Sequence, residues 1–141
     1  MYRQEIKKML NFTKGDKIQQ DFHLSESVYR QFISTFNDKN PLHTDEDFAV
    51  DKGFRGKVMH GNILNGFLSY FVGECLPTKN VIIHSQEIQF KNPVYLNQRL
   101  LFEAVISEVF DSVGVVEYKF QFKNAEALVV SKGKIQIGIL K

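Results

Sequence analysis

The spacing of apolar residues changes from helical to alternating along the chain, and this change predicts the order of the elements. Residues 26–36 carry apolar side chains three or four positions apart, directly after Ser25, a residue type that favours the N-cap position. This pattern predicts an amphipathic helix. Its apolar face comprises Val28, Phe32, Ile33 and Phe36.

Residues 61–76 are apolar almost all round, with Pro77 as a stop signal. A helix that is hydrophobic on every side is typical of a buried one. At a rise of ~1.5 Å per residue it would be roughly 24 Å long, enough to fill the hollow of a curved sheet. Gly66, Ser69 and Gly73 form a face of small residues, where another element can approach closely.

The second half of the chain has the two-residue period of strands. Segments 81–90, 100–107, 116–123 and 128–140 are separated by short turn signals, and residues 17–24 alternate weakly. We expect the last three strands to form an antiparallel meander, with Gly133 as a bulge. Helices followed by strands indicate an α+β fold in which an antiparallel sheet wraps around the long helix.

Composition favours a single globular domain over residues 1–141, with residues 1–14 as an irregular N-terminal arm. Apolar residues make up 43% and the net charge is +2, with no basic stripe, so neither nucleic acid nor a membrane surface is an expected partner. The one cysteine, Cys75, permits no intrachain disulfide, and we expect it to be an inert buried thiol. The charged start lacks the pattern of a signal peptide, and a cytoplasmic location is expected.

The candidate chemistry lies in residues 36–43, which read F-N-D-K-N-P-L-H. His43 follows Asp38 by five positions, and Pro41 disfavours the helical conformation at Asn40, so we expect a tight turn. A carboxylate and an imidazole aimed into one cavity can hold a water between them and transfer protons in either direction. The same residues are also ordinary turn formers, which leaves a purely structural interpretation open.

An acidic run at residues 45–47 follows, with Thr44 as the expected N-cap of a short helix that ends near Lys52. Acidic side chains in a first helical turn are favoured by the helix dipole. A metal site is the minor alternative, because three carboxylates on one turn would need ligands from elsewhere.

These features together resemble the hot-dog fold, and D-K-N-P-L-H resembles the signature of the MaoC-like dehydratases, the (R)-specific enoyl-CoA hydratase group. Met59-His60-Gly61 is similar to the family's entry to the central helix, and the resemblance covers roughly residues 12–110. Two positions depart from the pattern. Asn37 replaces a usual glycine, although asparagine tolerates the left-handed conformation, and Asn97-Gln98 replaces Gly-Asp.

The resemblance implies a lyase that reversibly hydrates trans-2-enoyl thioesters of coenzyme A or acyl-carrier protein to (3R)-3-hydroxyacyl thioesters. Asp38 and His43 would handle the water and Asn40 would support them. The Gly61 N–H would form the oxyanion hole, with Asn62 beside it. Arg55 and Lys57 would contact pantetheine phosphates or the acidic helix of a carrier protein, although solvated loop cations are commoner. No metal or cofactor is implied, and the partner subunit would be an identical chain in a homodimer or a larger homo-oligomer.

Two other functions stay open. A hot-dog acyl-CoA thioesterase would use a carboxylate and a helix-terminal amide but would not require N-P-L-H. A non-catalytic module that binds acyl thioesters would have no need of a proton-transfer pair. Of the other histidines, His60 is expected to cap or pack at the start of the central helix.

Overall fold

The computed structural model describes residues 11–141, so residues 1–10 of the expected N-terminal arm lie outside the described part. Residues 11–14 of that arm pack against the rest of the domain. Phe12 is buried in the hydrophobic core, and Gly15 N–H donates to the Ile106 carbonyl at 2.9 Å. None of the described helices has both the length and the apolar character needed to cross a bilayer.

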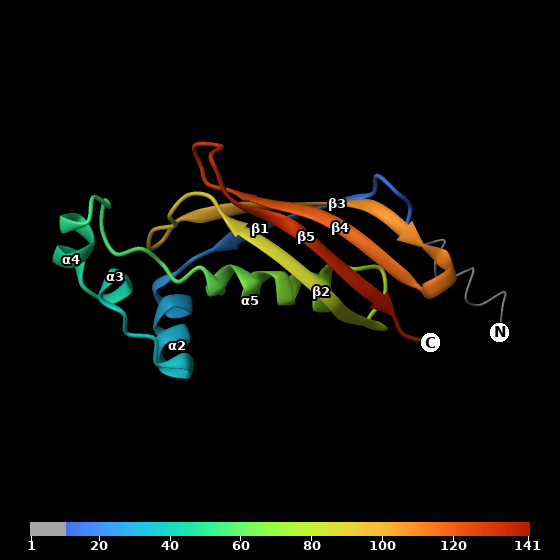
Figure 1. Cartoon of the computed structure of the whole chain (residues 1–141), viewed down its shortest axis with the longest axis horizontal. Helices are drawn as coiled ribbons and strands as arrows, with labels where there is room; N and C mark the ends of the chain where they lie inside the picture. Colours follow the sequence, from blue (N-terminus) through green and yellow to red (C-terminus); the bar gives the residue numbers. More distant parts are fainter. Residues whose placement is uncertain (1–10) are drawn as a thin grey trace.

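Five strands form one antiparallel sheet in the order β1-β3-β4-β5-β2 (Figure 1). The expected meander of the last three strands is confirmed, and β1 and β2 are the two edges. The strand bounds are Lys17–His23 for β1, Val81–Phe90 for β2, Arg99–Phe110 for β3, Val115–Lys123 for β4 and Val129–Ile139 for β5.

Gly133 is not a bulge, contrary to the expectation from sequence. It pairs in register with Phe120 on β4 and Ile88 on β2, and the register shifts of β2 and β3 occur near His84 and Ser107 instead. Its lack of a side chain has another cause, because a Cβ there would collide with the Glu87 carbonyl and the Phe120 ring. Glycine therefore permits a close approach between strands rather than an extra residue in one of them.

Helix α5, Asn62–Tyr70, continues without a break as a π-helical segment, Phe71–Cys75, and lies along one face of the sheet (Figure 1). The expectation of burial on every side is wrong for the single chain. The sheet covers only one side of the helix, so the small-residue face with Gly66, Ser69 and Gly73 is exposed. The buried side comprises Ile63, Leu64, Leu68, Phe71 and Val72.

Three helices lie together beyond one end of the sheet (Figure 1). They are α2, Glu26–Phe36; α3, Pro41–Thr44; and α4, Glu46–Asp51, and we call residues 26–51 the helical extension. Ser25 caps α2 as expected, by accepting from the Val28 N–H at 3.2 Å. The expected apolar face is only partly covered, because Phe36 is 67% exposed and the buried residue of α2 is Tyr29.

Two details of the turn differ from the expectation. Residues 41–44 form a single helical turn, since Pro41 disfavours a helical conformation only at the residue before it, Asn40. Asp45, not Thr44, caps α4, because its side chain accepts from the Phe48 N–H at 3.1 Å.

Candidate active site

The five strands and α5 together are called the sheet domain. Three side chains from separate parts of the chain meet where the helical extension joins it. Asp38 follows α2, His43 lies in α3, and His60 precedes α5. The Oδ2 atom of Asp38 lies 3.8 Å from His43 Nε2 and 4.0 Å from His60 Nε2. The two imidazole rings stack with centroids 4.0 Å apart. The expected meeting of a carboxylate and an imidazole is present, with a second imidazole beside it.

Local hydrogen bonds explain why the loop takes this shape. Asn37 ends α2 in the left-handed conformation, with φ 58°. Glycine and asparagine both tolerate this conformation, so asparagine can take the place of the usual glycine. Asp38 then accepts from the Asn40 N–H at 3.1 Å, and Asn40 accepts from the Leu42 N–H at 2.9 Å. Asn40 is therefore the N-cap of α3, and Pro41 occupies a first-turn position where no N–H is needed.

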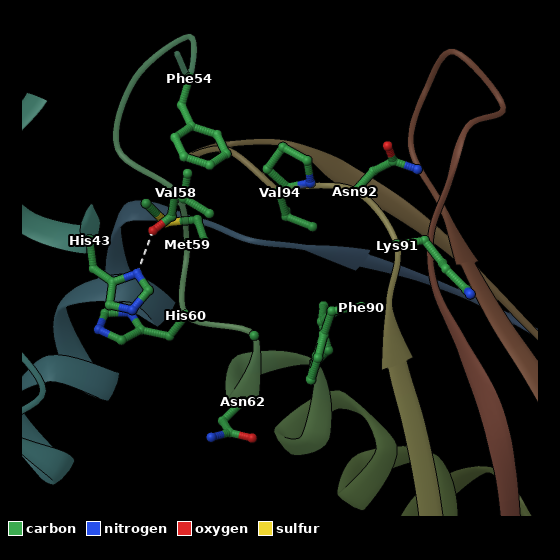
Figure 2. Close-up of a pocket in the computed structure, with 13 residues that line it drawn as sticks. His43, Phe54, Val58, Met59, His60, Asn62, Phe90, Lys91, Asn92 and Val94 are labelled. Carbon is green, nitrogen blue, oxygen red and sulfur yellow. Dashed lines mark hydrogen bonds between the residues drawn. The ribbon is translucent and has the colours of Figure 1, made fainter. Parts of the chain in front are cut away.

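The backbone fixes the tautomer of His43. Its Nδ1 lies 2.7 Å from the Val58 carbonyl oxygen (Figure 2), and a carbonyl can only accept, so neutral His43 carries its hydrogen on Nδ1. The lone pair of Nε2 then faces Asp38. Tyr29 OH donates to the His43 carbonyl at 2.5 Å and holds this residue from the other side. Two acceptors 3.8 Å apart suit one water that donates a hydrogen to each.

His60 is held differently. Its side chain is almost fully buried, and its Nε2 lies 2.9 Å from the Asp38 carbonyl oxygen. Burial, and secondarily the nearby His43, lowers the pKa of His60, against the opposing effects of that hydrogen bond and the Asp38 charge. The expectation that His60 packs is consistent with its burial. Its proximity to Asp38 was not anticipated, and the only signal was its place in the Met59-His60-Gly61 motif.

The same three side chains form the one candidate metal cluster in the described part of the chain, with ligand atoms within 4.8 Å of one another. The hydrogen bonds limit what they offer. His60 Nε2 donates to a carbonyl, so its lone pair is not available there. Two ligands, Asp38 Oδ2 and His43 Nε2, are left, fewer than the three protein ligands of a catalytic zinc site.

A cavity of about 460 Å³ opens beside the histidines. Figure 2 shows His43 and His60 on one side of it and Phe90, Lys91 and Asn92 on the other. Gly61 and Asn62 also line it, at the N-terminus of α5, and their backbone N–H groups have no acceptor among the described residues. A side chain at position 61 would press on the Phe90 ring, since a Cβ would lie 2.9 Å from it.

The two cations expected to bind substrate do not line this cavity. The Arg55 guanidinium lies over the Tyr95 ring at 4.5 Å, and the Lys57 ammonium lies over the Tyr29 ring at 5.2 Å. The cation that lines the cavity is Lys91, directly after β2. No local pattern marks Lys91 as a site residue, because its position depends on the pairing of β2 with β5.

A second, more apolar cavity of about 860 Å³ lies between α2 and α5. Asp38 lines this second cavity but not the first, whereas Asn62 lines both. The apolar lining of this second cavity comprises Val28, Phe32, Phe36, Ile63 and Phe67.

Comparisons with known proteins identify the family of this chain. The family described as "MaoC like domain" matches residues 4–126. An (R)-specific enoyl-CoA hydratase of Rhodospirillum rubrum is 37% identical over 71 residues, which are 50% of this chain and 49% of that protein. An enzyme of the same name from Aeromonas caviae is 29% identical over 93 residues, 66% of this chain and 69% of that protein. The match thus spans only about half the length of the first relative.

Solved structures show the same fold. The R-hydratase PhaJ1 of Pseudomonas aeruginosa superposes with a TM-score of 0.85 at 22% identity, covering 94% of this chain and 85% of that one. The (R)-hydratase of A. caviae gives 0.84 at 22% identity, covering 91% and 97%. The α+β hot-dog architecture expected from the sequence is confirmed.

Proposed function

Because the chain belongs to the MaoC-like domain family, we propose that it is a hydro-lyase that interconverts trans-2-enoyl and (3R)-3-hydroxyacyl thioesters. The observation that carries this proposal is the approach of Asp38 Oδ2 to His43 Nε2 at 3.8 Å, with the His43 lone pair directed at the carboxylate. His43 lines the cavity of about 460 Å³, and Asp38 lines the neighbouring cavity of about 860 Å³. The names of the curated relatives, which include two (R)-specific enoyl-CoA hydratases, support the reaction class.

In the hydration direction, one member of the pair removes a proton from the water as its oxygen bonds to C3 of the enoyl chain. The electron pair of the double bond moves toward the thioester and leaves negative charge on its oxygen. The protonated member of the pair then returns a proton to C2 on the same face. Because the same pair removes one proton and returns one from the same side of the double bond, the addition would be syn.

The charge on the thioester oxygen needs donors that are already in place. We assign this role to the backbone N–H of Gly61, with that of Asn62 next to it, because both are free at the positive end of the α5 dipole and line the cavity. Arg55, Lys57 and Lys91 are the candidate contacts for phosphates of coenzyme A or an acyl-carrier protein. Of these, Lys91 lines the cavity itself.

The direct test is an assay of crotonyl-CoA hydration, measured as the loss of enoyl absorbance. Asp38→Asn and His43→Ala should each lower kcat by ~10²–10⁴-fold, the usual contribution of a positioned acid or base. Asp47→Asn, a change of the same type at an exposed position of α4, is the control and should retain activity. Hydration that survives in Asp38→Asn would contradict the assignment. Release of CoA without hydration would favour a thioesterase, and binding without either reaction a non-catalytic module.

We also propose that the chain forms a homodimer through β2. This edge strand is exposed along most of its length, and it carries Ile82 at 50% and Ile83 at 39% exposure. Exposed apolar edge strands are usually paired or covered. Ile83→Lys should convert a dimer to a monomer in sedimentation experiments, whereas a monomeric wild type would contradict this part of the proposal. A cytoplasmic location stays a prediction.

A further inference from the structure

His60 contacts both members of the proposed acid–base pair and belongs to neither of the elements that carry them. Its Nε2 lies 2.9 Å from the Asp38 carbonyl oxygen, and its ring stacks on His43 at 4.0 Å between centroids and an interplanar angle of 30°. The ring centroid also lies 4.7 Å from that of Phe32 and 6.0 Å from that of Tyr29. His60 is therefore in contact both with the proposed pair and with aromatic residues of α2.

Only one of the two ring nitrogens of His60 has a hydrogen-bond partner in the described chain. Because the Asp38 carbonyl can only accept, Nε2 carries the hydrogen, and Nδ1 of the neutral ring is left with a lone pair. This Nδ1 is buried and has no partner among residues 11–141. A buried acceptor without a partner costs on the order of 1–3 kcal/mol. An apolar side chain would fill the same space without that cost, so packing alone does not account for an imidazole here.

We propose that His60 is a positioning residue, which as a neutral imidazole donates from Nε2 to the Asp38 carbonyl and so fixes the distance between Asp38 and His43. This inference rests on the proposed hydration activity. Asp38 itself is exposed, with a side chain 49% accessible, and among the described residues its carboxylate accepts a hydrogen bond from the Asn40 N–H alone. The His60 bond is the tie between its backbone and the sheet domain.

Neutral His60 suits this role for an electrostatic reason. A charged ring stacked on His43 would oppose protonation of His43, the step that the proposed reaction needs when His43 accepts a proton from water. A second hydrogen, on Nδ1, would also be a buried donor without an acceptor in the described chain. The reaction and the burial of the ring therefore both favour neutral His60.

The test compares two substitutions of similar size. His60→Gln places an N–H donor near the position of Nε2, and His60→Met has none. Both remove the stacked ring, so the difference between them reports the hydrogen bond. We expect kcat for crotonyl-CoA hydration to stay within about 5-fold of wild type in His60→Gln and to fall ~10²-fold in His60→Met, the size of loss that a small misplacement of catalytic groups produces. KM should change less than about 3-fold in either variant.

Thermal unfolding separates this role from a structural one. Similar melting temperatures for the two variants, with unequal kcat, would support the proposal. Equal kcat values in Gln and Met variants, a loss confined to KM, or a loss that follows the melting temperature would overturn it. His23→Gln, at the partly buried end of β1, is the matched control and should change none of these quantities.

A second readout does not depend on activity. With ¹³C- and ¹⁵N-labelled protein, the NMR spectrum of wild type should show His60 as the Nε2–H tautomer near neutral pH. The Asp38 carbonyl ¹³C shift should be retained in His60→Gln and altered in His60→Met. An Nδ1–H tautomer, or the same Asp38 shift in both variants, would overturn the proposal. If wild type does not hydrate enoyl thioesters, the proposed function fails while this measurement still decides the role of His60.

Discussion

The sheet domain and the helical extension are each stabilised by different interactions. Strands β3, β4 and β5 and helix α5 supply most of the hydrophobic core, including an aromatic cluster around Phe102, which is fully buried. In the helical extension, residues 26–51, only Tyr29 and Ala49 are buried. The proposed acid–base pair is therefore on a part of the molecule with much less apolar burial than strands β3 to β5.

Polar contacts replace apolar burial at the junction. The Val58 N–H donates to the Leu42 carbonyl at 3.0 Å, and the Val58 carbonyl in turn accepts from His43. Each such bond contributes only about 0.5–1.5 kcal/mol net. Segments with few buried contacts are also those that open locally before the whole domain unfolds. The global stability of this protein and the geometry of its site should therefore respond to different substitutions.

The largest contrast should come from the same change made in each region. Phe102→Ala should lower the free energy of unfolding by ~3–5 kcal/mol, because it leaves a cavity among the rings of Phe22, Phe71 and Phe122. Phe36→Ala, at a side chain 67% exposed in the helical extension, should cost less than about 0.5 kcal/mol. Urea denaturation measures both. Equal losses would show that α2 is as tightly packed as the sheet.

Adding a single carbon should also distinguish tightly packed from open positions. Gly133→Ala should cost ~1–3 kcal/mol, since its Cβ meets the Glu87 carbonyl and the Phe120 ring and must displace edge strand β2. Gly66→Ala, on the exposed face of α5 where a Cβ meets nothing within 4 Å, should instead stabilise the chain by ~0.5–1 kcal/mol. Denaturation midpoints provide the measurement, and destabilisation at both positions would contradict this interpretation of the two glycines.

Loss of one hydroxyl at the junction should affect the site more than the domain. Tyr29→Phe removes the hydrogen bond to the His43 carbonyl and should cost about 1 kcal/mol. Its main effect should be faster hydrogen exchange in α3, with β4 unchanged. Tyr70→Phe, at a half-exposed ring of α5, is the control and should leave both exchange rates as they are. A uniform increase across the sheet would mean that the junction is part of the global cooperative unit.

The smallest expected effect is a pH dependence from His60. Its folded pKa is below the reference value of 6.5, mainly because of burial, so below pH 6.5 the unfolded chain binds the proton first. The free energy of unfolding should therefore fall as the pH decreases from about 7 toward the folded pKa. His60→Gln should remove this component, which is obtained by subtracting the two stability profiles. If the wild type instead became more stable than the variant toward pH 5, the pKa of His60 would be raised on folding, contrary to this prediction.

Local patterns predicted the elements well because each depends on neighbours in sequence. Alternation located the four long strands, and Ser25 located the start of α2. Asn37 has the left-handed conformation that glycine would adopt at this position. Asn97, in the second departure from the family pattern, also has a positive φ, of 67°. These are short-range steric and hydrogen-bonding effects, which the residues themselves specify.

Contacts between distant segments were not predictable in the same way. His60 reaches the Asp38 carbonyl across 22 positions, and Lys91 comes to the cavity only because β2 pairs with β5. Arg55 and Lys57, chosen as cations near the motif in sequence, lie over aromatic rings outside the cavity lining. Proximity in sequence was a poor guide to which charges line the cavity.

By itself the sequence determined the α+β fold, the presence of a turn between Asp38 and His43 and the start of the central helix near Gly61, because hydrophobic period, capping and turn chemistry act over a few residues. The tertiary structure decided which groups surround that turn. It set the tautomer of His43 through the Val58 carbonyl, placed buried His60 against Asp38, and left one face of α5 uncovered. Those outcomes depend on how segments pack, and no local pattern encodes them.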